Sequence, residues 1–326
     1  MVDTGLILAG AIIVTTAIIT LFLTKLWMRA ARSFGLVGKD MNKWDKKDVP
    51  EAGGVAVVFS IVFGVLFFVF FKIFLLQTET HFVELFAIAL TVLLAGFLGF
   101  IDDILGWKKG LKQWQKPLLT IPIAIPLAVL NAGNLTLRIP FFGVVDFGLI
   151  LPLLIIPAAI VGSANGFNML AGLNGLEAGM GAIILCALSI ILYINQQSWL
   201  ALVAMIAVAT LFSFLLFNKY PAKVFPGNSL TYAIGALIGL LAVVGDAAGA
   251  GLVLFAPYFV ELVIKARHKF KTECFGIPQK DGTLRSPEKI SSLTHVGIKV
   301  FRSERGAVLG LLSMEVILAI IVLILL

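Results

Sequence analysis

Charged residues are scarce in this chain. Asp, Glu, Lys and Arg make up 13% of its 326 residues, whereas 60% are hydrophobic and the mean hydropathy is +1.05. Soluble globular domains carry about 25% charged residues. The shortage excludes an ordinary soluble domain and indicates that lipid is the main solvent of the chain.

Cysteine is almost absent as well. The chain has two cysteines, Cys186 within an apolar run and Cys274 in a loop. This pair cannot form a disulfide framework and matches no zinc-binding spacing. The sequence therefore gives no sign of a fold held by disulfides or zinc.

Long apolar runs are what the sequence has instead. A bilayer core about 30 Å thick needs roughly 20 apolar residues per helical crossing. The runs are apolar all round, whereas strands of a membrane barrel alternate polar and apolar residues. The sequence predicts an all-α, polytopic integral membrane protein with about ten transmembrane helices, at about 5–26, 53–76, 83–105, 117–133, 148–165, 176–195, 198–217, 229–245, 249–266 and 306–326.

Basic residues gather on one side of this arrangement. Of the 25 lysines and arginines, all but Lys72 and Arg138 lie in or beside the connections between spans 1–2, 3–4, 7–8 and 9–10. The positive-inside rule then predicts cytosolic odd-numbered connections and extracytoplasmic N- and C-termini. Lys25, Arg29 and Arg32 follow the first apolar run, which indicates a retained anchor rather than a cleaved signal. Topology and anionic lipid explain the net charge of +7 without a nucleic-acid partner.

Two carboxylates, Asp102 and Asp103, end the third apolar run. Carboxylates at membrane depth are costly and usually functional. The plain alternative is that both lie in the headgroup zone and pair with Lys108, Lys109 or Lys112. Neighbouring helical residues point about 100° apart, so one acid can face a metal ion or a nucleophile while the other orients a lysine.

Amides and glycines fill the end of the fifth run, Asn-Gly-Phe-Asn-Met-Leu-Ala-Gly-Leu-Asn-Gly-Leu-Glu (165–177). Asn165 and Asn168 are three residues apart and would share one helix face. Glycines let the backbone approach a ligand, and amide oxygens can ligate Mg²⁺ or hold a sugar. A plain asparagine-capped glycine turn is the alternative. Three Asn and one Glu among thirteen otherwise apolar residues argue against it.

The remaining cytosolic connections add anion-binding groups. A glycine turn precedes Asn228 and Ser229 at an expected helix start, which could bind phosphate or simply cap the helix. The first loop contributes Asp40 and Glu51, and the last, at about 267–305, is long enough to form a lid. Acids for a cation, amides for a sugar and lysines for phosphate are typical of phosphoryl transfer.

The chain resembles the polyprenyl-phosphate N-acetylhexosamine-1-phosphate transferases, and most of all their archaeal and eukaryotic dolichyl-phosphate GlcNAc-1-phosphate transferase branch. The resemblance rests on Gly-Phe-Ile-Asp-Asp (99–103), on the 165–177 string and on Tyr-Pro-Ala-Lys-Val-Phe-Pro-Gly-Asn-Ser (220–229), and it covers about 38–235. It implies ten spans and transfer of GlcNAc-1-phosphate from UDP-GlcNAc to a polyprenyl or dolichyl phosphate, with release of UMP. This is the first step of lipid-linked oligosaccharide assembly for protein N-glycosylation.

The resemblance also implies roles for individual residues and a cofactor, Mg²⁺ or alternatively Mn²⁺. Residues 1–326 would form a single transmembrane catalytic domain whose cytosolic loops, at about 27–52, 106–116, 166–175, 218–228 and 267–305, build the active site. The implied catalytic residues are Asp102, Asp103 and Lys112, and the implied metal ligands are Asn168 and Asn228. The implied substrate-binding residues are Met41, Glu51, Asn165, Asn174, Glu177, Arg267 and His268.

The chain departs from the family pattern at two points. Asn228 stands where the family usually has an aspartate, so an amide oxygen replaces a charged metal ligand. The last loop lacks the histidine cluster of the bacterial branches, because its histidines are only His268 and His295. The second departure disfavours a transferase of peptidoglycan precursors.

Two alternatives stay open from sequence alone. One is the same reaction with another UDP-N-acetylhexosamine, because a few hydrogen bonds decide which hydroxyl is recognised. The other is a transporter of a lipid-linked or free sugar, but transporters bind near the midplane, where only Glu261 and Glu315 are candidates here. The expected partners are a UDP-sugar, a polyprenyl or dolichyl phosphate and membrane lipid, with a homodimer left open. The site would face the cytosol at an archaeal plasma membrane or an ER membrane.

Overall fold

The computed structural model describes residues 2–106, 110–130, 136–139 and 143–325. Within these ranges eight helices are long and apolar enough to cross a membrane, or nine if one bent pair counts as a single span. The long helices are α1 (Val2–Ser33), α2 (Gly54–Phe74), α3 (Phe82–Leu105), α6 (Ile156–Met169, preceded by a π-helical turn, Leu151–Ile155), α7 (Leu176–Ile194), α8 (Ser198–Asn218), α9 (Gly227–Val244) and α13 (Glu304–Ile324).

The shorter helices account for the less regular parts of the predicted spans. They are α4 (Gln115–Thr120), the 3-10 turn η1 (Ile121–Ala124), α5 (Ile125–Leu130), α10 (Ala248–Leu254), α11 (Ala256–Arg267) and α12 (Leu293–Phe301). The expected span at 117–133 corresponds to one short apolar helix, Gln115–Leu130, whose middle turn is a 3-10 turn with Pro122 at its start. Residues 131–133 of that span, residues 107–109 of the expected second loop and residue 326 lie outside the described ranges. A total of ten crossings stays a prediction.

The predicted span at 249–266 is a bent pair rather than one straight helix. Its two parts, α10 and α11, meet at Phe255 with an angle of 55°. Pro257 lies in the first turn of α11 and cannot donate the backbone hydrogen bond that a continuous helix would need there. The proline therefore accounts for the break.

Three short antiparallel hairpins lie in the connections, and the all-α prediction missed them. They are β1 (Val37–Lys39) with β2 (Asp48–Pro50), β3 (Thr136–Ile139) with β4 (Gly143–Asp146), and β5 (Ile277–Pro278) with β6 (Leu284–Arg285). Each has only two strands of two to four residues. The protein is mostly helical, and its hairpins shape loops rather than form a sheet layer.

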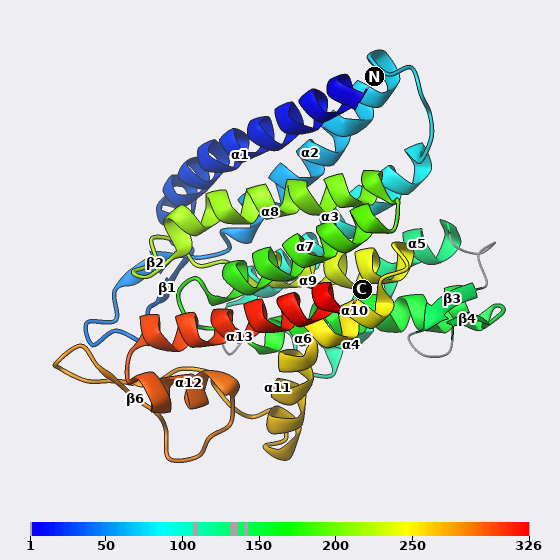
Figure 1. Cartoon of the computed structure of the whole chain (residues 1–326). Helices are drawn as coiled ribbons and strands as arrows, with labels where there is room; N and C mark the ends of the chain where they lie inside the picture. The colour runs from blue at the N-terminus through cyan, green and yellow to red at the C-terminus, as the bar shows by residue number, and fades with distance from the viewer. Residues whose placement is uncertain (1, 107–109, 131–135, 140–142, 326) are drawn as a thin grey trace.

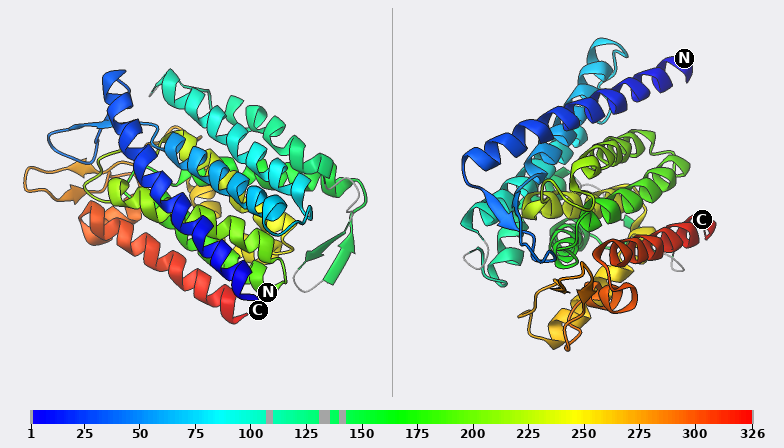
Figure 2. Two further views of the ribbon diagram at one scale, coloured as in Figure 1. Left: turned by 90° about the horizontal axis from the view of Figure 1, so that it is seen from above. Right: turned by 90° about the vertical axis from the view of Figure 1, so that its left-hand side faces the viewer.

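The bundle has two distinct ends. The chain termini lie at the same end as the β3–β4 hairpin, and the β1–β2 hairpin, β6 and α12 lie at the opposite end (Figures 1 and 2). The loops with most of the lysines and arginines belong to this second end. We call it the loop end; the segregation agrees with the basic-residue pattern of the sequence.

Helix α9 occupies the centre of the bundle. It is the most buried of the candidate spans, and it packs against α3 and α6. Glycines make these contacts close. A Cβ atom on Gly235 would lie 2.5 Å from the Ser163 carbonyl oxygen, and one on Gly99 would lie 2.2 Å from the Asn228 carbonyl oxygen. The start of α9 is thereby held directly against α3.

Gly99→Ala should destabilise the protein. The new methyl would meet backbone atoms of Asn228 and Ser229, which cannot rotate away, so α3 and α9 must separate at a cost of about 1–3 kcal/mol. The thermal unfolding midpoint in detergent should fall by several degrees. Gly162→Ala on α6 is the matched control, because a Cβ there meets nothing within 4 Å. Equal midpoints for the two variants would contradict the close α3–α9 contact.

Candidate active site

The two aspartates at the end of α3 have different partners. The Asp103 carboxylate accepts hydrogen bonds from the backbone N–H groups of Asn228 (2.6 Å) and Ser229 (3.1 Å), in the first turn of α9. A carboxylate at a helix N-terminus satisfies free N–H groups and interacts favourably with the helix dipole. Asp103 therefore fixes the start of α9 against α3.

Asp102 collects charged and polar partners from two other segments. Its Oδ2 atom accepts from the Asn228 side-chain amide at 2.9 Å and lies 2.8 Å from Nζ of Lys116 on α4. Its Oδ1 atom accepts from the Leu111 backbone N–H at 2.7 Å. The sequence predicted that one of the two acids could orient a lysine. Asp102 is that acid, and the lysine is Lys116.

Asn168 joins the aspartates through a threonine. The Thr231 hydroxyl on α9 donates to the Asn168 side-chain oxygen at 2.8 Å, and it lies 3.2 Å from the Asn228 carbonyl oxygen. We call Asp102, Asp103, Asn168, Asn228 and Thr231 the acid–amide cluster. It connects the C-terminal ends of α3 and α6 to the N-terminal end of α9.

A second polar group, the loop junction, lies where the first loop, the 170–175 segment and α13 meet. The Asn174 backbone N–H donates to Glu304 at 2.8 Å, and its side chain donates to Asp40 at 3.0 Å. Lys43 forms an ion pair with Glu304, and its Nζ lies 3.9 Å from the centre of the Tyr220 ring. All three carboxylate and amide side chains here are buried. The junction is a hydrogen-bonded network that holds the loops together.

Glu177 and Asn42 extend the loop junction around Gly172. The Gly172 N–H donates to Glu177 at 2.8 Å, and the Asn42 side chain donates to the Gly172 carbonyl at 2.9 Å. The second carboxylate oxygen of Glu177 is buried and has no hydrogen-bond partner among the described residues. Because Gly172 has a φ of 102°, a side chain at this position would strain the backbone.

The long last loop packs onto this region through defined contacts. The Gly276 N–H donates to the Asn42 side chain at 2.9 Å, and Lys265 binds the Met169 carbonyl. His295 is buried, accepts from the Ser291 N–H at 3.2 Å and lies 3.1 Å from the Phe275 carbonyl, which assigns the proton to Nε2. Burial lowers the pKa of His295, so the ring is neutral near pH 7. His295 therefore holds the last loop in place through these two contacts.

The structure brings most of the predicted residues to the loop end. Asp102, Asp103, Asn168 and Asn228 share the acid–amide cluster, while Asn174 and Glu177 belong to the loop junction; Met41 lies between Asp40 and Asn42 of that junction. Half-buried Glu51 is close enough to Asp103 for their charges to interact, and burial raises the pKa of Glu51.

Four predicted residues have other surroundings. Asn165 donates to Thr120 (2.9 Å) and to the Val161 carbonyl, and so ties α4 to α6. The Lys112 side chain is exposed. Arg267 is exposed at the end of α11, and His268 contacts the Ile264 carbonyl at 3.0 Å. Among the described residues, no contact joins Lys112, Arg267 or His268 to the cluster or the junction.

Three residues with contacts to the cluster or the junction carry no signal in the sequence. Lys116 stands four positions after Lys112, and only the fold shows which of the two reaches Asp102. Thr231 looked like an ordinary residue in an apolar run. Glu304 precedes the last run, where a charge normally faces water, yet it is buried. Its pairing with Lys43 spans 261 residues, so no local pattern could reveal it.

The acid–amide cluster fits a magnesium ion by its donor type. Its candidate ligands, carboxylate and amide oxygens, are hard donors, and Mg²⁺ usually takes one or two carboxylates together with water and substrate phosphates. Within the described residues no group of three or more His, Cys, Asp or Glu side chains could hold a metal ion. A metal here would need amide, water and phosphate oxygens to complete its shell.

Comparison with known proteins agrees with this chemistry. The model of glycosyl transferase family 4 matches residues 85–246. A relative from Saccharolobus solfataricus is 39% identical over 309 residues, covering 93% of this chain and 92% of its own, and one from Sulfolobus acidocaldarius is 37% identical with the same coverage. Both are provisionally named UDP-N-acetylglucosamine–dolichyl-phosphate N-acetylglucosaminephosphotransferase.

Bacterial relatives match less of the chain. The phospho-N-acetylmuramoyl-pentapeptide-transferase of Halalkalibacterium halodurans is 31% identical over 207 residues, or 61% of each chain. The Saccharolobus and Sulfolobus relatives cover 93% of it, in agreement with the branch that the sequence motifs favour. This chain therefore belongs to glycosyl transferase family 4, the phospho-sugar transferases that include the polyprenyl-phosphate N-acetylhexosamine-1-phosphate transferases.

Proposed function

We propose that this transferase moves N-acetylglucosamine 1-phosphate from UDP-N-acetylglucosamine onto a polyprenyl or dolichyl phosphate and releases UMP at the cytosolic face of the membrane. The names of its archaeal relatives support the two substrates. One structural observation carries the proposal: oxygen donors from α3, α6 and α9 form one hydrogen-bonded group at the loop end. Transfer between a water-soluble donor and a lipid acceptor needs its site at such an end.

The reaction is a substitution at phosphorus. An oxygen of the lipid phosphate bonds to the β-phosphorus of the donor, and the bond from that phosphorus to the bridging oxygen breaks. The bridging oxygen leaves with UMP, while the bond between the sugar and its phosphate stays intact. Because the lipid phosphate is already anionic at neutral pH, positioning and charge neutralisation carry most of the catalysis.

The acid–amide cluster is suited to holding the reacting phosphates. Asp102 and Asp103 contribute carboxyl oxygens, and Lys116 lies 2.8 Å from Asp102 and offsets its charge. Asn168 and Asn228, with the two aspartates, would hold Mg²⁺ together with water and diphosphate oxygens. When bound, Mg²⁺ neutralises charge on the diphosphate and on the departing UMP.

The loop junction is suited to the donor side of the site. The 165–177 segment contains Asn168 of the cluster and Gly172 and Asn174 of the junction, so it links the two groups over a few residues. We assign the nucleoside to the neighbourhood of Met41 and Glu51, where the first loop approaches Asp103. A sugar and its nucleoside would then lie on one side of the phosphates and the lipid on the other.

A direct assay tests the reaction. Purified protein would be incubated with Mg²⁺, polyprenyl phosphate and UDP-GlcNAc labelled in the sugar, and label in the organic phase would be compared with UMP released. We expect lipid-soluble label and UMP in equal amounts. UDP-GalNAc is the matched control for sugar specificity. If UDP-GlcNAc stays intact while UDP-GalNAc is turned over, the donor is UDP-GalNAc. If no sugar nucleotide is turned over, the proposal of an enzyme is rejected.

Asp103→Asn and Asn168→Ala should each lower turnover at least ~tenfold, because each removes a positioned group beside the developing charge. Gly162→Ala on the same helix, α6, is the matched control for Asn168. It lies outside the cluster and its new methyl meets nothing within 4 Å, so it should retain most of the activity. Monodisperse elution in detergent would verify folding. Near-normal turnover of both site variants would remove these residues from the reaction.

Asn228→Ala should raise the Mg²⁺ concentration needed for half-maximal activity. The change removes an amide oxygen from the cluster but keeps the backbone N–H that Asp103 accepts at 2.6 Å. Asn228→Asp should lower that concentration, because a charged oxygen binds a hard cation more strongly. Mg²⁺ titration of all three proteins measures the effect. Three superimposed curves would mean that Asn228 holds no metal.

A further inference from the structure

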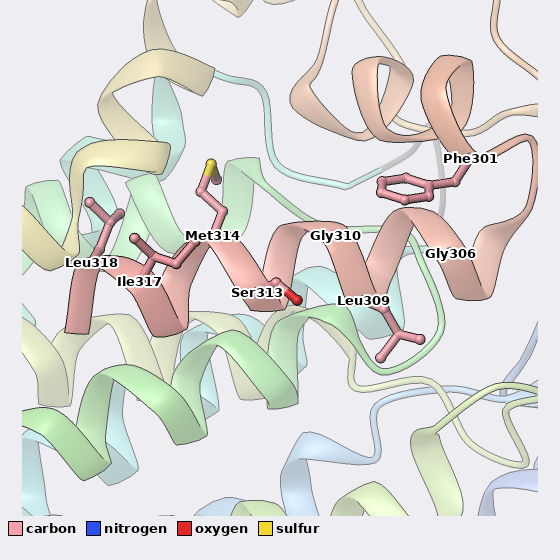
Figure 3. A pocket seen from close by; sticks show the side chains of 8 residues that line it. All are labelled: Phe301, Gly306, Leu309, Gly310, Ser313, Met314, Ile317 and Leu318. Atoms are coloured by element: carbon pink, nitrogen blue, oxygen red, sulfur yellow. The ribbon is translucent and has the colours of Figure 1, made fainter. Parts of the chain in front are cut away.

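An apolar groove runs along the outer face of α13 and starts at the loop end (Figure 3). It has a volume of about 590 Å³ and is lined by Phe301 of α12 and by residues of α13: Gly306, Leu309, Gly310, Ser313, Met314, Ile317 and Leu318. Ser313 is its one polar side chain. The groove is separate from the acid–amide cluster, which involves neither helix.

Two glycines and one aromatic ring create the groove. A Cβ atom on Gly310 would lie 2.4 Å from the Phe301 ring, and one on Gly306 would lie 2.8 Å from the Phe301 Cβ. The ring therefore stands over the first turns of α13, where both glycines leave a hollow. Leu309 and Ile317 are more than half exposed along its length. In a membrane-spanning helix this apolar face meets lipid chains.

Three basic residues adjoin the loop end of the groove in the chain. Lys299, Arg302 and Arg305 are exposed, and Arg302 and Arg305 flank the groove residues Phe301 and Gly306 in the chain. Within the described ranges no carboxylate pairs with any of the three, and the nearest acid in sequence, Glu304, is committed to Lys43. Exposed basic residues that adjoin an apolar groove in the chain fit a ligand with an anionic head and an apolar chain.

Helix α12 is shaped for the membrane surface. Val296, Val300 and Phe301 are 40%, 67% and 50% exposed, while His295 and Ile298 face the protein. A helix with one apolar exposed side and flanking basic residues lies in the interface between headgroups and acyl chains. At such an interface Lys299 and Arg302 would lie at the depth of lipid phosphates.

We propose that the groove between α12 and α13 binds an anionic membrane phospholipid. One chain lies along Leu309, Ser313 and Ile317, and the phosphate lies between Arg302 and Arg305 with Lys299 beside it. The bound head is adjacent to Glu304, whose carboxylate accepts the Asn174 N–H at 2.8 Å. The lipid thus occupies a site distinct from that of the reacting lipid phosphate. Arg305 of this site is the next residue in the chain after Glu304 of the loop junction.

Native mass spectrometry of the detergent-solubilised full chain tests the headgroup. The protein would be titrated with phosphatidylglycerol and, separately, with neutral-headed phosphatidylcholine. A surface arginine favours an anionic lipid by about 1 kcal/mol, or about fivefold, so we expect a clear preference for phosphatidylglycerol. Arg302→Gln with Arg305→Gln should abolish it. Equal retention of both lipids by the unaltered protein would overturn the proposal.

Arg29→Gln with Arg32→Gln is the matched control, because it removes two exposed arginines from the loop end of α1, across the bundle from α13 (Figure 1). This pair should keep the preference. An equal loss in both double variants would mean general surface charge rather than a site, and would also overturn the proposal.

Ser313→Trp tests the groove itself. The residue is exposed, so the indole should fill the groove without disturbing the core. We expect phosphatidylglycerol retention to fall severalfold although both arginines remain. Unchanged retention would reject the groove as the chain site. If the unaltered protein shows a protein dimer instead of a lipid adduct, and Ser313→Trp shows no dimer, the groove binds a second copy of this chain.

Discussion

The contact between Asp103 and the start of α9 organises the loop end. A carboxylate at the end of a membrane helix needs hydrogen-bond donors, and the first turn of a helix has free N–H groups that need acceptors. Each satisfies the other at 2.6 and 3.1 Å. The fit demands that Gly99 and Gly227 carry no side chain, because a Cβ on Gly227 would lie 2.4 Å from the Asp103 carboxylate. Two helix ends are thereby fixed relative to each other.

The rest of the acid–amide cluster depends on that contact. Once α9 starts at Gly227, the side chain of Asn228 reaches Asp102 and that of Thr231, one turn later, reaches Asn168. The groups of the candidate site then come from helix ends that are packed in the bundle rather than from free loops. A site held on rigid elements needs little rearrangement when charge develops on a phosphate.

The sequence predicted the parts that local chemistry controls. Lipid imposes the length of apolar runs, so most helices were found, and the acid pair and the 165–177 segment stood out because polar groups are rare there. The break before Pro257 was missed although the proline is a local signal for it. The three hairpins were missed because they depend on how the chain packs. Glu304 could not be identified because its partner, Lys43, is far away in the sequence. Lys116 could not be identified because no sequence pattern specifies which lysine of the connection reaches Asp102.

Two further buried acids bear on the choice between an enzyme and a transporter. Glu261 on α11 is fully buried, but it accepts the Leu293 N–H at 2.7 Å and forms an ion pair with Lys265 at 3.4 Å, so it secures the last loop. Glu315 on α13 is the other buried acid that the sequence singled out. A substrate site near the midplane would need several convergent polar groups. The convergent groups lie instead at the loop end, where a water-soluble nucleotide and a lipid phosphate can meet.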